Sequence, residues 1–519
     1  MSKNSFSDYK FYAFITALLC LLFSDINAQN AAVLQTVSPY SRYGIGDFQM
    51  GGGMLNAGLG GGGIGYRNDS MIPQYINKLN PASLTSHQMV TYEVSMVSNT
   101  VQLNNTGSSA IFNRTTLGSI ALAFPVKKWW GASIGLMPYT SVGYNVSVQD
   151  TVANLGPVTY KYEGSGGINQ VYTAHAFRPF AGLPRRYILS EKYELARAAK
   201  DTAAIRRRLK TVNALSNISL GFNASYMFGS LTNVRRDVFP DSLQTFNTKI
   251  TKNTLFRDLY ISYGLQYSFR INRIINPVRA ALPDSNIVKT SWLKNEFTIT
   301  RKGVRETKPL WMKSPGVRVT FGAIAALPME LAVSYDLLAQ TYKQVGTIEQ
   351  FKDTAAYDNS IPSRAGFPLM AGFGFGFKKD YKWIFQADYT TQLWDNFTYL
   401  GVRTGLKNSQ RITAGFQFQP QIAGRGKYMQ VVQYRIGARW HVTSLEINNT
   451  QLTEYAFNFG MALPVPYRTR LGEPIGRLNM TFEAGTRGTL QSGLIKENFL
   501  RVTVGLTIND RWFNRSKID

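Results

Sequence analysis

The chain has 519 residues, a formal net charge of +26 and a single cysteine, Cys20. One cysteine excludes disulfide scaffolds and Cys-ligated zinc sites. The 45 glycines, 31 phenylalanines and 28 tyrosines, with a mean hydropathy of −0.16, suit a protein of many short strands whose faces alternate between lipid and water.

The N-terminus has the layout of a secretory signal peptide. Lys3 and Lys10 precede an unbroken apolar run over residues 11–23, and small and polar residues follow up to Ala28. We predict cleavage after Ala28, so that residues 1–28 are the signal peptide. The alternative, an uncleaved anchor, needs roughly twenty apolar residues, which this run does not reach. Because Cys20 lies in this peptide, the mature chain is expected to contain no cysteine.

Segments along the rest of the chain alternate between apolar and polar residues. The pattern is clear at residues 217–228, 411–419, 432–441 and 500–508. Past residue 28 there is no long apolar stretch, and only helices and closed barrels satisfy every backbone group in lipid. The sequence therefore predicts an all-β fold, a transmembrane antiparallel β-barrel with a polar interior. The alternative, a soluble β-sandwich, does not explain the export signal.

We predict about fourteen strands. Residues 88–513 form the barrel and residues 514–519 a short C-terminal tail. The expected strands are 88–103, 113–126, 130–148, 164–178, 217–229, 255–271, 315–338, 366–378, 381–397, 409–420, 428–446, 452–464, 474–488 and 498–513. An even number of strands puts both barrel ends on the periplasmic side.

Two motifs near the N-terminus resemble a known family. A glycine-rich run at residues 58–65 leads to Asn80-Pro81-Ala82, just before the first predicted strand. This arrangement resembles the FadL-type transporters of long-chain fatty acids and other hydrophobic compounds, a family of outer-membrane barrels that includes PorV-like members. Residues 166–172, 217–229 and 388–394 and the C-terminal strand look like later blocks of the same family. The resemblance implies fourteen strands and an N-terminal hatch in the lumen.

Residues 29–87 are expected to form this hatch, a plug with Asn80, Pro81 and Ala82 as its ligand or hatch residues. The segment is rich in glycine and shows little alternation, so it would not cross lipid as a strand. Its Gly58-x-Gly60-x-x-Gly63 also fits a dinucleotide fingerprint. That interpretation is rejected because no βαβ unit surrounds the glycines.

The resemblance also implies a sideways exit through a kinked third strand. The third predicted strand contains Pro138 near its middle, with Gly143 five residues later. Proline lacks the N–H that a strand ladder needs, so these two residues are candidates for a lateral opening. An equally weighted alternative places Pro138 at the rim, after a shorter strand.

Two connections are longer than a barrel needs, at residues 180–215 and 272–316, and strand parity predicts that both are periplasmic. Residues 190–210 predict an inserted amphipathic helix with Arg206, Arg207 and Arg208 crowded near its C-terminal end. The default interpretation is a solvated loop. The alternative is a docking surface for a periplasmic or outer-membrane protein, with these three arginines as partner-binding residues.

The excess of basic residues indicates an anionic partner. In the predicted compartment the candidates are outer-membrane lipid and lipopolysaccharide, an acidic solute or a fatty-acid carboxylate, and no nucleic acid. Arg435 and Arg439 are the candidate basic residues of the lumen. His87, His175 and His441 show no metal-type spacing, and no motif selects a nucleophile, so no catalytic residue, metal or cofactor is predicted and the protein is not expected to be an enzyme.

Two functions follow from these observations. The first is an outer-membrane barrel that binds or passes hydrophobic or amphipathic small molecules through a hatch-filled lumen and a lateral opening. The alternative is a barrel without transport activity, a subunit of a complex for protein secretion or outer-membrane assembly, which docks partners through its basic periplasmic insertions.

Overall fold

The computed structural model describes residues 38–49, 53–68, 74–153, 155–188, 190, 194, 201–240, 245–271, 274–275, 286–291, 296–301, 304–309, 312–313, 317–346, 348–379, 382–421, 427–465 and 476–510. The predicted signal peptide and C-terminal tail lie outside the described residues. Parts of the predicted hatch and of both predicted insertions lie outside them as well.

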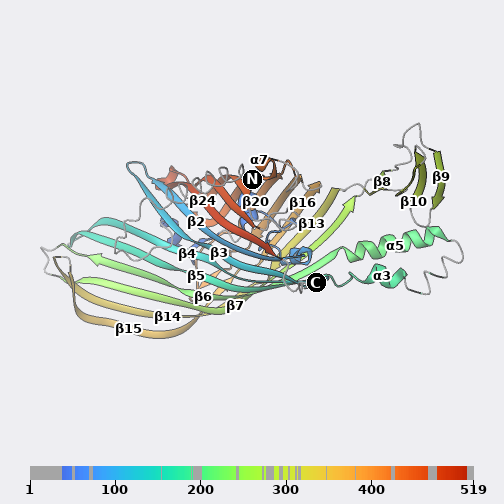
Figure 1. The fold of residues 1–519 in the computed structure, drawn as a ribbon. Helices are drawn as coiled ribbons and strands as arrows, with labels where there is room; N and C mark the ends of the chain where they lie inside the picture. Colours follow the sequence, from blue (N-terminus) through green and yellow to red (C-terminus); the bar gives the residue numbers. More distant parts are fainter. Residues whose placement is uncertain are drawn as a thin grey trace, which may run out of the picture.

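Fourteen antiparallel strands form one closed ring (Figure 1). In order around the ring they are β2 (Val90–Asn104), β3 (Ser109–Lys127), β4 (Trp130–Val152), β5 (Gly156–Phe177), β6 (Ile218–Val238), β7 (Asn247–Ile271), β13 (Val317–Ala326) continued by β14 (Met329–Val345), β15 (Ile348–Phe367) continued by β16 (Met370–Lys379), β17 (Trp383–Gln392), β20 (Ser409–Phe418), β21 (Gln433–Ile447), β22 (Thr450–Pro464), β23 (Gly476–Arg487) and β24 (Lys496–Asp510).

The first and last strands close the ring. β2 pairs with β24 over its whole length, from Val90 with Asp510 to Asn104 with Lys496. Two of the fourteen strands are interrupted: Leu327 and Pro328 separate β13 from β14, and two residues separate β15 from β16. The predicted fourteen-stranded antiparallel barrel is confirmed.

Alternation along the strands sorts the side chains as the sequence predicted. Outward residues are apolar and exposed, as at Phe457 (72%) and Ile436 (55%), whereas inward residues such as Arg435 (1%) are buried. Such a wall presents apolar groups to lipid and hides polar groups inside. No helix among the described residues is long and apolar enough to cross a membrane.

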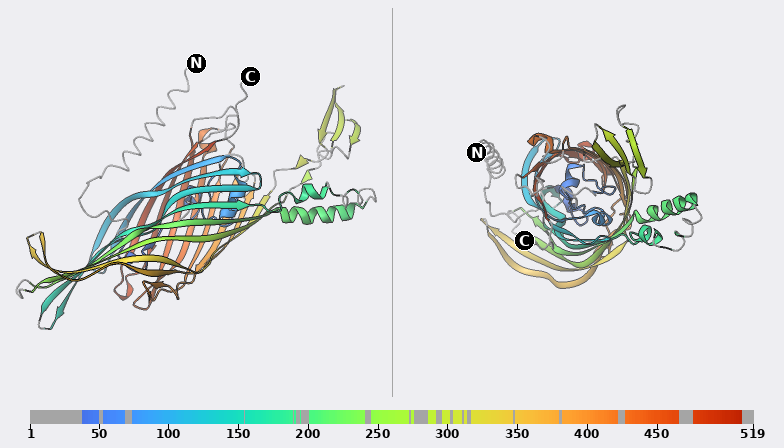
Figure 2. Two further views of the ribbon diagram at one scale, coloured as in Figure 1. Left: turned by 90° about the horizontal axis from the view of Figure 1, so that it is seen from below. Right: turned by 45° about the vertical axis from the view of Figure 1, so that its right-hand side comes forward.

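Six neighbouring strands run far beyond the rest of the ring (Figure 2). β4 to β7 have 23, 22, 21 and 25 residues, whereas crossing a bilayer takes about 9–11. Together with β14 and β15 their outer parts form a curved sheet, which we call the extension. Beyond Ala365, which pairs with Tyr399, the outer part of β15 has no second strand partner among the described residues.

The two long connections lie at the opposite end of the barrel, which we call the insertion end (Figure 1). The first contains helices α3 (Leu183–Ile188) and α5 (Thr202–Ser216), and the second contains a small sheet of β9 (Asn286–Ser291), β10 (Glu296–Arg301) and β11 (Val304–Pro309), with β8 (Ile274–Ile275) paired to β12 (Met312–Lys313).

The helix predicted over residues 190–210 needs correction at both ends, because α5 begins at Thr202 rather than at Ser190. It ends at Ser216 rather than at Lys210, because the apolar face continues to Val212, which is buried. The side chain of Asp201 caps it by accepting a hydrogen bond from the Ala204 amide at 2.9 Å. Arg206, Arg207 and Arg208 therefore lie in the first half of α5, not at its C-terminal end.

Candidate functional site

The described part of the N-terminal region lies inside the ring (Figure 2, right). We call residues 38–49, 53–68 and 74–89 the inner segment. Its glycine-rich run is held by Asp388 of β17, whose carboxylate accepts hydrogen bonds from the amides of Gly63, Ile64 (3.0 Å) and Gly65 (3.3 Å). The last glycine of the dinucleotide-like pattern, Gly63, and the two residues after it thus bind a side chain of the barrel wall.

The Asn-Pro-Ala motif anchors the inner segment to a second part of the wall, at β7. Asn80 caps the short 3-10 helix η2 (Pro81–Ser86) by accepting a hydrogen bond from the Ala82 amide at 3.1 Å. Its amide nitrogen donates to the carbonyl oxygens of Ile64 (2.9 Å) and Leu265 (3.2 Å). Asn80, Pro81 and Ala82 are all buried, so the motif forms a packed joint between the inner segment and β7.

The ladder between β3 and β4 is short. It runs from Lys127 with Trp130 to Ile120 with Leu136, and the rest of β3 pairs only with β2. Past Leu136, two residues before Pro138, the two strands are no longer paired with each other. We call this unpaired stretch, residues 109–119 of β3 and 137–152 of β4, the seam.

Both residues predicted for a lateral opening lie on the seam. Pro138 has no N–H to donate, and the β4–β5 register shifts between Pro138 and Thr140. Gly143 donates its amide to the Ser41 hydroxyl of the inner segment at 3.1 Å. The structure thus places Pro138 and Gly143 within one part of β4, next to the inner segment.

A two-residue strand of the inner segment occupies part of the seam. This strand, β1 (Asp47–Phe48), pairs with Ser141 and Thr140 of β4, and the Gln49 amide donates to the Tyr139 carbonyl at 2.9 Å. Over this stretch β1 replaces β3 as the neighbour of β4. Sequence reasoning missed β1, since two residues carry no detectable alternation.

An ionic cluster on β23 and β24 tethers β1. Arg487 of β23 donates to the Asp47 carboxylate at 3.0 Å and pairs with Glu497 of β24 at 2.6 Å. The Ser38 hydroxyl donates to Glu497 at 2.6 Å. The position of β1 therefore depends on charged groups that come from the last two strands of the barrel.

Two cavities meet at β1. The larger has a volume of about 230 Å³ and lies inside the ring; the smaller, about 80 Å³, lies toward β2, β3 and β24. Asp47, Phe48 and Gln49 line both cavities. The β1 strand is thus the wall between the lumen and the β3 side of the seam.

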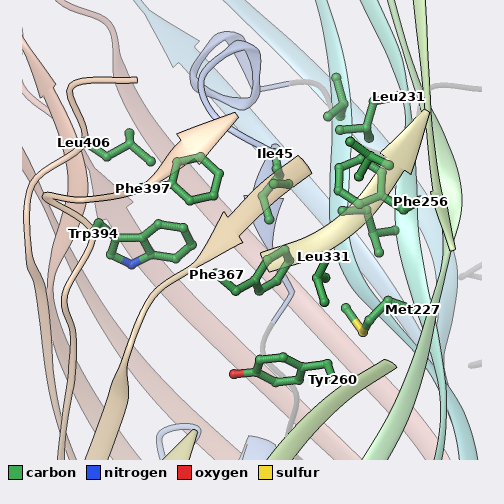
Figure 3. Packing of buried hydrophobic residues seen from close by; sticks show 14 of the residues in the cluster. Ile45, Met227, Leu231, Phe256, Tyr260, Leu331, Phe367, Trp394, Phe397 and Leu406 are labelled. Atoms are coloured by element: carbon green, nitrogen blue, oxygen red, sulfur yellow. The ribbon is translucent and has the colours of Figure 1, made fainter. Parts of the chain in front are cut away.

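The larger cavity has an apolar side and a charged side. Phe48 packs against Tyr139 and Trp394, with ring centroids 5.6 and 5.1 Å apart, and the apolar side continues into a buried cluster that includes Ile45, Tyr260 and Leu406 (Figure 3). The charged side chains in its lining are Asp47, Lys78, Arg411, Glu454 and Arg487. Such a lining suits a molecule with one apolar and one polar end.

The predicted lumen arginines lie inside the ring, and both are engaged by the wall. Arg435 donates to Gln417 at 2.9 Å and to Asn479 at 3.1 Å. Arg439 pairs with Glu454 at 2.5 Å and with Glu483 at 2.9 Å. Their side chains hold neighbouring strands together, and neither lines the larger cavity.

The residues proposed for partner binding lie apart from the lumen. Arg207 and Arg208 are exposed on α5, which projects away from the ring at the insertion end (Figure 1). His87, His175 and His441 belong to the inner segment, β5 and β21 respectively. Within the described ranges, no group of three or more histidine, cysteine or acidic residues is placed to hold a metal ion.

The closed ring, apolar outside and polar inside, defines a β-barrel of the outer-membrane class. A family model described as BamG matches residues 11–184 and 314–519. The chain belongs to the BamG family. The unmatched stretch between the two regions includes α5 and the small sheet of β9, β10 and β11. No curated protein matches the sequence.

Solved structures of FadL-type barrels are similar to this chain, in keeping with the resemblance seen in the sequence. They include the toluene transporter TbuX of Ralstonia pickettii (10% identity, TM-score 0.46, 88% of this chain and 98% of that chain). The P. putida toluene transporter TodX (10%, 0.46, 90% and 100%) and a Pseudomonas aeruginosa FadL homologue (8%, 0.43, 83% and 93%) are others. At this level the likeness carries no argument about a ligand.

Proposed function

We propose that this protein is an outer-membrane barrel that binds a hydrophobic or amphipathic small molecule in the larger cavity and passes it sideways through the seam. In this proposal the inner segment is the hatch, β1 is the gate, and the protein is not an enzyme. The observation that carries it is that the β3–β4 ladder stops at Leu136 and that β1 takes the vacated place, with a cavity on either side.

The chemistry of the cavity supports this class of ligand. Aromatic and aliphatic groups of Phe48, Tyr139 and Trp394 contribute apolar surface, while Lys78 and Arg411 line the same space. A cavity of about 230 Å³ is somewhat smaller than the roughly 300–1,000 Å³ of sites for drug-sized ligands. A small ligand, or one end of a longer one, suits this volume.

Locking β1 onto β4 tests the gate. Phe48 lies directly opposite Thr140, at a Cα separation of about 4.5–5.5 Å that a disulfide can bridge. Since the only native cysteine is Cys20, the pair Phe48→Cys and Thr140→Cys is expected to close without competition. The assay is uptake of radiolabelled oleate, and of radiolabelled toluene, by cells that carry the protein.

Uptake is expected to fall to background when the pair is oxidised and to recover after reduction. The matched control is Ile436→Cys with Phe459→Cys, a directly opposed pair on the β21–β22 ladder away from the seam, whose oxidation leaves uptake unchanged. Unchanged uptake of both probes by the oxidised gate pair would overturn the proposal. A second variant, Pro138→Val, restores a backbone N–H at this position of β4. It is expected to slow uptake, because the added hydrogen-bond donor favours strand pairing at the seam.

A second candidate function is a barrel subunit that docks other proteins of a secretion or assembly complex. Two observations favour it: the outer part of β15 has a strand partner on one side only among the residues that the structure describes, and such edges are templates for pairing with another chain; and α5 presents Arg207 and Arg208 to solvent. In this candidate the insertion end faces the periplasm, and the apolar outer wall contacts outer-membrane lipid and lipopolysaccharide.

Co-purification in mild detergent tests this candidate. Removal of residues 190–210, or the double variant Arg207→Glu and Arg208→Glu, should release a protein that accompanies the intact chain. The charge-matched control is Lys127→Glu with Lys128→Glu, two consecutive exposed basic residues where β3 turns into β4, outside both insertions. If the intact chain always purifies alone, the candidate fails.

A further inference from the structure

The smaller of the two cavities that meet at β1 contains an arginine without a described partner. Arg114 belongs to the part of β3 that forms the seam, and its side chain lines this cavity of about 80 Å³. Its Nε atom is buried, and no hydrogen bond or ion pair joins its guanidinium group to the residues that the structure describes. A buried donor without a partner is costly, so the cavity favours a ligand that can accept a hydrogen bond.

The other charged residues of this lining are already paired. Each has a partner of opposite charge within ion-pair distance: Asp47 and Glu497 with Arg487, Glu454 with Arg439, and Arg501 with Glu483. Among the described residues of the lining, Arg114 is therefore the one charged side chain that contacts no group of opposite sign.

Strand register places Arg114 in a row of polar side chains. Arg114 lies directly opposite Asn99 of β2, which lies opposite Arg501 of β24. All three side chains line the cavity. Since neighbouring strands are about 4.8 Å apart, the two arginines are separated by two strand spacings, with Asn99 between them. The side-chain oxygen of Asn99 is buried and has no hydrogen-bond partner among the described residues.

An apolar row lies next to this polar row. Two residues along each strand, Phe112 lies opposite Val101, and Val101 lies opposite Phe499. These three side chains also line the cavity, and the guanidinium carbon of Arg501 lies 5.4 Å from the centre of the Phe499 ring. This wall of the cavity thus offers charged hydrogen-bond donors beside a strip of apolar surface.

The two rows suit one end of an amphipathic anion. A guanidinium group binds a carboxylate through two parallel N–H bonds, and the apolar row would cover the first carbon atoms of the attached chain. Because Arg501 already contacts Glu483, the polar row has one cation left to neutralise. A second negative charge on the ligand would face the carboxylates of Asp47, Glu454 and Glu497 in the same lining, which would repel it.

We propose that this wall of the smaller cavity is a second binding site, in which Arg114, assisted by Asn99, holds the singly charged oxyanion of an amphipathic molecule, such as a carboxylate, at the seam. The inference rests on the proposed function, because the site lies on the β3 side of β1 and would receive the ligand once β1 has moved. It adds to that function a residue that selects ligands by their charge beyond the gate.

Photolabelling of the full-length protein in uncharged detergent tests the site. The probe is decanoate with a diazirine group beside the carboxylate, used well below saturation so that labelling follows affinity, and the labelled peptides are identified by mass spectrometry. Labelling of residues 109–119 should fall at least about tenfold in Arg114→Gln, since a hydrogen bond between charged groups contributes more free energy than a tenfold change in affinity requires. Labelling of residues 388–394, which include part of the lining of the larger cavity, should not change.

Three controls separate the effect of charge from an effect on folding. Arg114→Lys keeps the charge and should retain part of the labelling of residues 109–119. Arg257→Gln, which removes an exposed arginine outside both cavities, should retain all of it. The matching alcohol, decanol with the same diazirine group, carries no charge, so its labelling should not depend on Arg114.

The outcomes distinguish this inference from the proposed function. If residues 388–394 are labelled but residues 109–119 are not, or if Arg114→Gln is labelled like the unchanged chain, the inference is overturned while ligand binding in the larger cavity stands. If Arg114-dependent labelling of residues 109–119 is equal in the oxidised and reduced forms of the Phe48→Cys and Thr140→Cys pair, the seam site is supported and the proposed route through the gate fails. Labelling of neither region would overturn both.

Discussion

The two halves of the barrel wall are built to different lengths. On one side, β20 to β24 have 10–15 residues each and are paired on both sides. On the other side, β4 to β7 have 21–25 residues and continue into the extension. The short wall matches the thickness of a bilayer, whereas the long wall carries the seam and the open edges.

The inner faces of the two halves also differ. Arg439, Glu454 and Glu483 form a buried ionic cluster on the short wall, and an apolar cluster around Phe256 and Leu331 lies on the long wall (Figure 3). A buried ionic cluster tolerates little movement, because each charge needs its partner in place. The short wall is therefore held by charge pairs that tolerate little change, whereas the apolar cluster of the long wall can accommodate it.

Breaking the ionic cluster of the short wall should have the largest effect on stability. Arg439→Met leaves Glu454 and Glu483 buried without their shared cation, and such a loss costs about 3–5 kcal/mol. The midpoint of unfolding, followed by the heat-dependent shift in gel mobility, should fall accordingly. The control is Arg364→Met on the extension, whose ion pair with Glu330 is 72% and 61% exposed and contributes at most about 1 kcal/mol. Similar losses in both variants would contradict the comparison.

The next largest effect is expected on the pH dependence of stability, through His87. His87 of the inner segment is buried, and its two ring nitrogens have no hydrogen-bond partner among the described residues. Burial, followed by the charge of Arg67, lowers the pKa of His87 to about 4. Below pH 6.5, His87 therefore binds a proton in the unfolded chain but stays neutral in the folded barrel. The free energy of unfolding falls as the pH falls toward 4.

Between pH 7 and pH 5 this proton uptake should remove about 2 kcal/mol of stability. His87→Gln should abolish that part of the pH dependence, whereas His175→Gln on β5 should not. The measurement is the unfolding midpoint of each variant at a series of pH values. Identical pH dependence for the His87 variant and the unchanged chain would show that the folded barrel admits the proton.

A smaller effect is expected at one of the close contacts between the inner segment and the long wall. At Gly221 of β6 a Cβ atom would lie 2.6 Å from the Ala82 nitrogen, so Gly221→Leu must displace η2, at a cost of about 1–3 kcal/mol. Gly107→Ala, in a hairpin loop where a Cβ meets nothing within 4 Å, is the control. Protease cleavage within the inner segment should increase only in the Gly221 variant.

The short wall and the long wall also differ in how well their strands could be predicted from the sequence. The short-wall strands were predicted within a few residues, because each alternates between lipid and lumen along its whole length. The outer end of β15 was missed: residues 348–364 are mostly exposed, so nothing imposes alternation there. The sequence did place Pro138 and Gly143 on one strand. It did not reveal β1, whose two residues contact β4 and β23 only because the ring closes.

The smallest effect on the ring is expected from shortening the extension. Gln340 pairs with Thr354 near the outer part of the β14–β15 hairpin, so residues 341–353 can be replaced by an Asn-Gly turn. The free energy of unfolding should change by no more than about 0.5 kcal/mol, since the ring below keeps its pairing. A large loss would mean that the extension supports the barrel rather than projecting from it.

Hydrogen exchange in lipid nanodiscs tests most directly the claim that the short wall is fully paired whereas the seam and the outer edge of the extension are not. Peptides from β21 and β22, paired on both sides, should stay protected for hours, whereas peptides from residues 109–118 of β3 and 348–363 of β15 should exchange at least tenfold faster. Equal protection of all four regions would mean that the seam and the edge of the extension are closed by other parts of the chain, and the account given for this barrel would be wrong.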